Sequence, residues 1–231
     1  MNLIEINSLI KDRNPVEQLG KLSSAFNGRI IFTTSFGIED QVISHFIFTN
    51  NIPVKVATLD TGRLFPETYK VFNETVKKYG KKIEVYLPSH EDIEKMETEK
   101  GPCSFYYSKE ARLECCRIRK TDPLKRALKG INCWISGIRK DQSDNRSRMD
   151  QLEYDSARML FKFYPLFDWM YNDVRQYVVD NSIPYNVLHD KGYVSIGCEP
   201  CTRAVKQGED FRAGRWWWET GGNKECGIHS G

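Results

Sequence analysis

The sequence predicts an α/β fold, in which helices cover a parallel sheet. Short apolar runs rich in β-branched residues alternate with segments of helical pattern from about residue 15 to residue 138. Strands that alternate with helices form parallel sheets with right-handed crossovers. With 231 residues, 40% of them apolar, the chain is long enough to bury a sizeable core as one domain of ordinary size.

Each element has its own local signal. Pro15 suits the first turn of a helix, and residues 29–34 are apolar and β-branched, as strands are. The expected elements, in order, are a helix over 15–26, a strand over 29–34, a helix over 39–49, a strand over 54–59, a helix over 66–79, a strand over 83–87, a polar helical stretch, a helix near 109–129 and a strand over 133–138.

Loops 35–40, 60–64 and 137–146 follow predicted strands, where parallel sheets bind ligands. The first is a small, hydroxyl-bearing turn into a helix, whose backbone N–H groups and dipole would suit an anion. It lacks the GK[ST] of a Walker A loop. A capping turn, with Glu39 and Asp40 complementing the helix dipole, explains the same residues equally well.

Composition excludes several classes of protein. Seven cysteines, an odd number, are too sparse for a disulfide scaffold. Met1 is not followed by a secretion signal, and no stretch approaches the roughly 18 apolar residues of a membrane span. A net charge of +3 does not demand a nucleic-acid partner. We expect a cytoplasmic protein with no membrane or nucleic-acid partner, and a homo-oligomer is among the open options for its assembly.

The spacing of four cysteines predicts a site for a soft metal or an iron-sulfur cluster. Cys115 and Cys116 are adjacent, and Cys198 and Cys201 form a C-x-x-C motif far downstream. Thiolates select zinc or iron-sulfur centres over hard cations. The alternative is four thiols buried by coincidence. Cys226 is left over as a candidate nucleophile.

The other two cysteines are not expected to be ligands, and Cys133 lies in an apolar run typical of a buried strand, where cysteine acts as a small hydrophobe. Cys103 is the second of them.

Two adjacent cysteines on a helix cannot easily bind the same metal or cluster, because neighbouring helical side chains point about 100° apart. We therefore expect a bend or a helix end at Cys115 and Cys116.

Basic residues gather in three clusters, after the cysteine pair, after the strand at 133–138 and after the C-x-x-C motif. A solvated surface explains each cluster alone, whereas convergence on one anionic small molecule explains all three together. The clusters comprise Arg117, Arg119, Lys120, Lys125 and Arg126, then Arg139, Lys140, Arg146 and Arg148, and finally Arg203, Lys206, Arg212 and Arg215.

Six collinear motifs, spread over nearly the whole chain from about residue 30, resemble the assimilatory sulfonucleotide reductases, which reduce adenylyl sulfate or its 3'-phosphorylated form to sulfite. They are Thr34-Ser35-Phe36-Gly37-Ile38-Glu39-Asp40, Leu59-Asp60-Thr61-Gly62, Cys115-Cys116-Arg117-Ile118-Arg119-Lys120, Ser136-Gly137-Ile138-Arg139-Lys140-Asp141-Gln142-Ser143, Ile196-Gly197-Cys198-Glu199-Pro200-Cys201-Thr202 and Glu225-Cys226-Gly227-Ile228-His229. The two cysteine pairs resemble the cluster-bearing, adenylyl-sulfate branch of that family.

The resemblance implies a Rossmann-like parallel sheet of the adenine nucleotide α-hydrolase type, over residues 1–205, and a mobile tail over 206–231. It also implies a [4Fe-4S] cluster on the four paired cysteines. Cys226 would attack the sulfur of adenylyl sulfate and form an enzyme S-sulfocysteine, because a thiolate is a soft nucleophile. A separate thioredoxin or glutaredoxin-like dithiol would then release sulfite.

Charge assigns the remaining roles. Lys120, Arg139, Arg146, Arg212, Arg215 and His229 are candidates to bind the anionic groups of the substrate, and Lys120 and His229 to assist Cys226 in catalysis. Backbone groups of Ser35, Gly37, Leu59 and Gly137 would line the nucleotide cleft. In this interpretation Lys120 lies between cluster and substrate.

Three other functions stay open: reduction of the 3'-phosphorylated nucleotide or of both, a PP-loop thiolase, and a zinc-stabilised nucleotide-binding module. The thiolase should carry an SGGxDS-type loop, which Ser35-Phe36-Gly37 does not match. The zinc module should be colourless, unlike a brown iron-sulfur protein.

Overall fold

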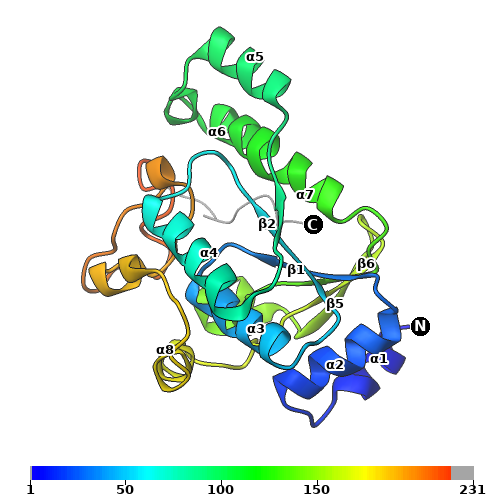
Figure 1. Cartoon of the computed structure of the whole chain (residues 1–231). Coiled ribbons are helices and arrows are strands. Elements are labelled where there is room, and N and C mark those ends of the chain that lie inside the picture. The colour runs from blue at the N-terminus through cyan, green and yellow to red at the C-terminus, as the bar shows by residue number, and fades with distance from the viewer. Residues whose placement is uncertain (1, 220–231) are drawn as a thin grey trace.

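The computed structural model describes residues 2–219, whose strands form one six-stranded sheet in the order β3-β2-β1-β4-β6-β5 (Figure 1). Neighbouring strands are parallel, apart from β5, which pairs antiparallel with β6. The prediction of an α/β fold with a parallel sheet is therefore confirmed. The strands are β1 (Ile30–Thr34), β2 (Lys55–Leu59), β3 (Glu84–Tyr86), β4 (Cys133–Ile135), β5 (Leu152–Asp155) and β6 (Leu160–Phe163).

Several helices begin and end where the sequence predicts. The helix with Pro15 in its first turn starts there, and the Asn14 side chain accepts a hydrogen bond from the N–H of Glu17 at 3.0 Å. The helices are α1 (Leu3–Ile10), α2 (Pro15–Phe26), α3 (Ile38–Thr49), α4 (Pro66–Tyr79), α5 (His90–Lys100), α6 (Lys109–Cys116), α7 (Asp122–Ala127) and α8 (Tyr171–Asp180). Within residues 2–219, none has the length and apolar content needed to cross a bilayer.

The central strand β1 is buried on both faces of the sheet. Ile30 and Phe32 belong to a large core shared with α1, α2, α3 and α8. Ile31 faces the other side, where it packs with Leu124 and Ala127 of α7. A strand covered on both faces has a continuous apolar sequence, which is why it could be recognised from its residues alone.

The helix predicted near 109–129 is present but interrupted. α6 ends at Cys116, a π-helix spans Arg117–Thr121, and α7 begins at Asp122, whose N–H donates to the carbonyl of Arg117, five residues back. Pro123 has no N–H, and its ring would clash with the carbonyl of Arg119 in a regular α-helix, which favours the wider turn. The distortion expected at the cysteine pair is confirmed.

The strand expected over 133–138 is shorter, since β4 ends at Ile135. Cys133 within it is fully buried, as predicted, and burial raises the pKa of its thiol. The sequence did not predict β6, which carries a charge in the core: Lys162 is 7% exposed, and its Nζ lies 2.8 Å from Asp155 Oδ2. Cys103, in contrast, is exposed.

Candidate active site

A cavity of about 210 Å³ lies at the carboxyl ends of β1, β2 and β4. The chain runs from β1 to β2 and β3 on one side, and β4 lies on the other side of β1. In α/β sheets ligands bind where the strand order reverses in this way. Residues of all three predicted loops, 35–40, 60–64 and 137–146, line the cavity.

The loop after β1 is closed by a carboxylate of the helix that follows. Ser35 donates its backbone N–H and its hydroxyl to Asp40 Oδ2, at 2.6 and 2.8 Å. Burial raises the pKa of Asp40 to about 7, against the opposing effect of these hydrogen bonds. Ser35 and Gly37 line the cavity, but both donors of Ser35 are occupied by Asp40, as in a capping turn.

The loop after β4 passes very close to the first turn of α3. A Cβ added to Gly137 would lie 2.4 Å from Asp40 Oδ1 and 3.0 Å from Glu39 Cβ. Those two carboxylates are themselves buried and hydrogen-bonded. Glycine at this position therefore lets two walls of the cavity approach each other.

We expect Gly137→Ala to lower the free energy of unfolding by about 1–3 kcal/mol, because the added methyl group must displace buried atoms of Asp40. Urea denaturation measures the change. Gly20→Ala in α2 is the matched control, because its Cβ would meet no atom within 4 Å and should stabilise the helix by roughly 0.5–1 kcal/mol. Equal effects of the two substitutions would contradict the close approach.

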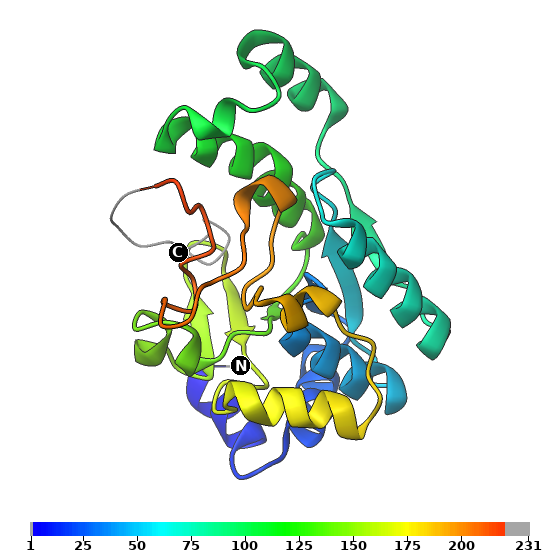
Figure 2. The ribbon, with the colours of Figure 1, turned by 90° about the vertical axis from the view of Figure 1, so that its left-hand side faces the viewer.

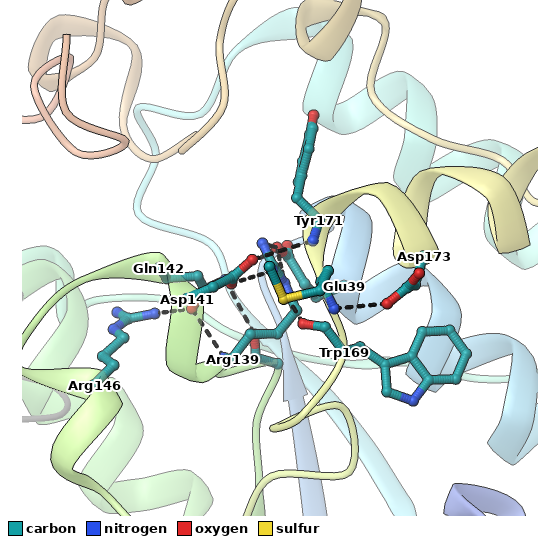
Figure 3. A network of polar contacts seen from close by, with 10 residues as sticks. Glu39, Arg139, Asp141, Gln142, Arg146, Trp169, Tyr171 and Asp173 are labelled. Atoms are coloured by element: carbon teal, nitrogen blue, oxygen red, sulfur yellow. Dashed lines mark hydrogen bonds and ion pairs between the residues drawn. The ribbon is translucent and has the colours of Figure 1, made fainter. Parts of the chain in front are cut away.

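Arg139 does not lie where the sequence interpretation expects it. It does not line the cavity but is fully buried behind it, where its Nε donates to Glu39 Oε1 at 3.0 Å. It also pairs with Asp141, and Gln142 donates to the same Glu39 oxygen (Figure 3). We correct the expectation that Arg139 contacts the substrate: its guanidinium instead fixes the carboxylate of Glu39.

The other lysine and arginine residues expected to bind the substrate do line the cavity. Arg146, Arg212 and Arg215 are between 6% and 8% exposed, and Lys120 reaches the cavity from the π-helix. Arg215 packs so tightly on Gly197 that a Cβ there would lie 2.3 Å from Arg215 Nη2. The cavity therefore gathers four cationic groups, although their positions in the sequence span almost a hundred residues. Leu59 and Gly137 line it as well.

All four expected ligand cysteines line one second, small cavity. Cys115 and Cys116 come from the end of α6. Cys198 directly precedes the turn at 199–201 and Cys201 is its last residue; this turn lies beside α6 in Figure 2 (orange against green). Within residues 2–219, no three histidine, cysteine or acidic side chains form a ready-made site for a single metal ion. The four cysteines nevertheless converge from two segments of chain that are far apart in the sequence.

The surroundings of the cysteine cavity are strongly cationic. Its lining includes Arg63, Arg112, Arg119 and Lys120. Among the described residues, Arg112 Nη1 and Arg119 Nε are buried without a hydrogen-bond partner. Burial opposes ionisation of Cys198, but the charge of Lys120 and a hydrogen bond with Thr61 at 3.4 Å outweigh it and lower its pKa. Such a lining suits a negatively charged, thiolate-ligated group.

The described chain ends beside this cavity. Arg112 donates from Nε and Nη2 to the two carboxylate oxygens of Glu219, at 2.8 and 2.9 Å, and stacks 4.5 Å over the ring of Trp216. Trp216 itself is 1% exposed. Of the expected tail over 206–231, the part up to Glu219 thus packs against the body, whereas Cys226 and His229 lie outside the described residues.

A family model for the phosphoadenosine phosphosulfate reductase domain matches residues 29–204, more than half of the chain. The chain belongs to the phosphoadenosine phosphosulfate reductase family. It is 49% identical to the adenosine 5'-phosphosulfate reductase of Agrobacterium fabrum over 212 residues, 91% of this chain and 82% of that protein. It is 46% identical to the protein of the same name from Neisseria meningitidis serogroup B, covering 86% of this chain and 81% of that one.

Solved structures agree with this family. The phosphate complex of phosphoadenylyl-sulfate (PAPS) reductase from Candida auris superposes with a TM-score of 0.74 at 26% identity, covering 89% of this chain and 98% of that one. An FMN adenylyltransferase from Candida glabrata, 14% identical with a TM-score of 0.52 over 92% of this chain and 78% of that one, shares the fold alone. The fold is thus that of the adenine nucleotide α-hydrolases, as expected.

Parts of the site of this reductase-family protein give no signal in the sequence. Thr61 lies within one of the motifs, but the motif does not indicate its hydrogen bond with Cys198. Nothing in the sequence indicates roles for Arg112 and His189, because a single charged or imidazole side chain in a helical pattern gives no signal of its own. Only the fold brings Arg112 to the cysteines and His189 to the strand ends.

Proposed function

We propose that this family member is an adenosine 5'-phosphosulfate reductase that releases sulfite and AMP, using electrons from a thioredoxin or glutaredoxin-like dithiol protein in a reducing cytoplasm. The observation that carries the proposal is the position of Lys120, which lines both the cavity at the strand ends and the four-cysteine cavity. Relatives bearing this enzyme's name over most of the chain support it.

The larger cavity suits a nucleotide with a phosphosulfate group. Ser35, Gly37, Leu59 and Gly137 provide a wall of backbone from three strand ends, against which a nucleoside can lie. The anionic groups would be bound by Lys120, Arg146, Arg212 and Arg215. Arginine offers a bidentate fork to such oxygens, and lysine a point charge.

The four-cysteine cavity would hold a [4Fe-4S] cluster through Cys115, Cys116, Cys198 and Cys201. The soft donor set and the unpartnered guanidinium N–H groups beside it fit such an anionic group. When bound, the cluster supplies negative charge close to the substrate rather than electrons, because the dithiol already delivers an electron pair. Lys120 lines both cavities, so its ammonium group would interact with the negative charge of the cluster and with that of the substrate.

In the reaction, the Cys226 thiolate attacks the sulfate sulfur. A sulfur-sulfur bond forms, the sulfur-oxygen bond to AMP breaks, and AMP leaves with the electron pair. A dithiol thiolate then attacks Cys226 Sγ, sulfite leaves with the electrons of the sulfur-sulfur bond, and the second thiol of the dithiol frees Cys226. The dithiol becomes a disulfide, and sulfur is reduced by two electrons. His229, three residues after Cys226, would bind substrate or thiolate.

Sulfite release from each nucleotide in the presence of reduced thioredoxin tests the proposal. We expect turnover of adenosine 5'-phosphosulfate and much less of its 3'-phosphorylated form. The second candidate, a PAPS reductase or an enzyme of dual specificity, is favoured by the structural match to the Candida auris protein. Preference for the 3'-phosphorylated nucleotide would establish it and overturn our choice of substrate.

Lys120→Ala should weaken catalysis and substrate affinity by at least about 1 kcal/mol, on the order of a charged hydrogen bond. Steady-state kinetics measures the loss as kcat/KM, and iron content checks that the cluster is retained. Lys140→Ala is the matched control, since Lys140 pairs with Asp168 at 2.6 Å on the surface. Equal kinetics for the two variants would contradict the proposed role of Lys120 between the cluster and the substrate.

A further inference from the structure

One buried side chain of the nucleotide cavity has no assigned role. His189 lies in the short helical turn Val187–Lys191 and is only 7% exposed, yet it lines the cavity. Neither ring nitrogen has a hydrogen-bond partner among the described residues. Buried polar groups are nearly always hydrogen-bonded, because an unsatisfied one loses its interactions with water without compensation. An imidazole with two unsatisfied nitrogens beside a cavity indicates a ligand.

The backbone holds His189 firmly in this position. Its N–H donates to the carbonyl of Asn186 at 3.0 Å. Asn186 is 1% exposed, accepts from the N–H of Leu188 at 3.0 Å, and donates from its side chain to Thr68 Oγ1 at 3.1 Å. Thr68, in the first turn of α4, lines the same cavity. The ring is thus presented by a hydrogen-bonded turn rather than by a loose loop.

The charge state of His189 limits what it can bind. Burial has the largest effect and lowers the pKa of its imidazole. Glu39 acts in the opposite direction, Arg175 lowers the pKa by less than Glu39 raises it, and the Tyr193 backbone and Asp190 raise it by smaller amounts, so that burial decides the direction. A neutral imidazole has one donor and one acceptor nitrogen. Phosphate and sulfate oxygens at neutral pH only accept, so they would leave the acceptor nitrogen unsatisfied. Ribose hydroxyls and the edge of adenine offer both donors and acceptors.

We propose that His189 binds the nucleoside part of the substrate, donating one hydrogen bond to it and accepting another. This inference rests on the proposed function, since it requires that the cavity binds a nucleotide. Recognition is then divided: the basic residues bind the anionic end, and His189 recognises the nucleoside.

The test compares His189→Phe with the wild type by calorimetric titration with AMP. Phenylalanine keeps an aromatic ring but has no hydrogen-bonding group. We expect AMP affinity to fall about tenfold, as for the loss of two net hydrogen bonds. We also expect the ligand-free variant to unfold at a midpoint roughly 2–4 °C higher, because the unsatisfied imidazole is gone. A purely structural histidine would give the opposite change in stability.

Two further variants make the test specific. His189→Gln keeps a donor and an acceptor and should retain most of the AMP affinity. His45→Phe, in α3 away from the cavity, removes a hydrogen bond to Tyr79 at 3.0 Å and should lower stability without changing AMP affinity. Ribose 5-phosphate, as a second probe, tells the two nucleoside contacts apart: a loss for both ligands assigns His189 to the ribose, and a loss for AMP alone to adenine.

Wild-type AMP affinity in His189→Phe, or an equal loss in His189→Gln, would overturn the inference. So would a less stable His189→Phe with normal AMP binding, because His189 would then be satisfied by a bound water. If the wild type itself binds no AMP and releases no sulfite, the proposed function is wrong, and the inference about His189 is wrong with it. If the wild type binds AMP and releases sulfite but His189→Phe binds AMP normally, only the inference about His189 is wrong. The two failures are therefore distinguishable.

Discussion

Replacing Cys226 with serine is expected to abolish sulfite release while leaving AMP binding and the brown colour of the protein intact. A serine hydroxyl at neutral pH is a far poorer nucleophile toward sulfur than a thiolate. Sulfite production with reduced thioredoxin measures the first effect, and calorimetric titration with AMP the second. Because the substitution leaves all the described residues that line the two cavities in place, we expect no change in the binding of cluster or nucleotide.

Cys103→Ser is the matched control, because Cys103 is an exposed thiol that lines neither cavity. It should turn over normally. The intermediate can be trapped directly: with substrate carrying labelled sulfur and no dithiol, the wild type should keep the label on Cys226, and Cys226→Ser should not. Sulfite release at the wild-type rate by Cys226→Ser would refute the mechanism.

Cys198→Ser should lose the cluster and much of the stability of the fold. Cys198 is 7% exposed and packs with Cys115, Cys201 and Trp216 in one cluster of buried residues. Without its fourth thiolate the site would leave three cysteines and several guanidinium groups facing an unfilled cavity. Since binding energy at such sites is coupled to folding, its loss is a loss of stability. Iron content, visible absorption and thermal unfolding measure the two effects.

Cys133→Ala separates the loss of a ligand from the loss of a buried thiol. Cys133 is fully buried in β4, so its truncation should cost roughly 1 kcal/mol of stability and leave the colour unchanged. Replacing Cys115, Cys116 or Cys201 should reproduce the Cys198→Ser result. If Cys133→Ala bleaches the protein, or Cys198→Ser keeps its full iron content, the ligand assignment is wrong.

The sequence was informative where a pattern is local. Strands such as Ile30–Thr34 are buried on both faces and have continuous apolar sequences, and Pro15 marks the start of its helix. The pair Cys115 and Cys116 could be expected to need a distorted helix, because two adjacent side chains cannot point the same way in a regular one. Each of these predictions depends on neighbours within a few residues.

It was uninformative where partners are distant in the chain. Arg139 follows a strand in a basic segment. Nothing local indicates that its guanidinium donates a hydrogen bond to Glu39, a hundred residues earlier (Figure 3). β6 escaped recognition because the buried ion pair of Lys162 with Asp155 places a charge inside a strand. Which basic residues face the cavity was decided by the fold, through contacts such as that of Arg215 with Gly197.

The π-helix Arg117–Thr121 places one more residue in its turn than an α-helix would. Deleting one residue there would restore regular winding and rotate α6 about 100° relative to α7. Since Leu124 and Ala127 hold α7 against the sheet, α6 would turn, and Cys115 and Cys116 would no longer face Cys198 and Cys201. The convergence of the four thiols depends on the rotation of α6 about its axis relative to α7, which the extra residue of the π-helix sets. A difference in length of a single residue therefore separates a chain that gathers the four thiols from one that does not.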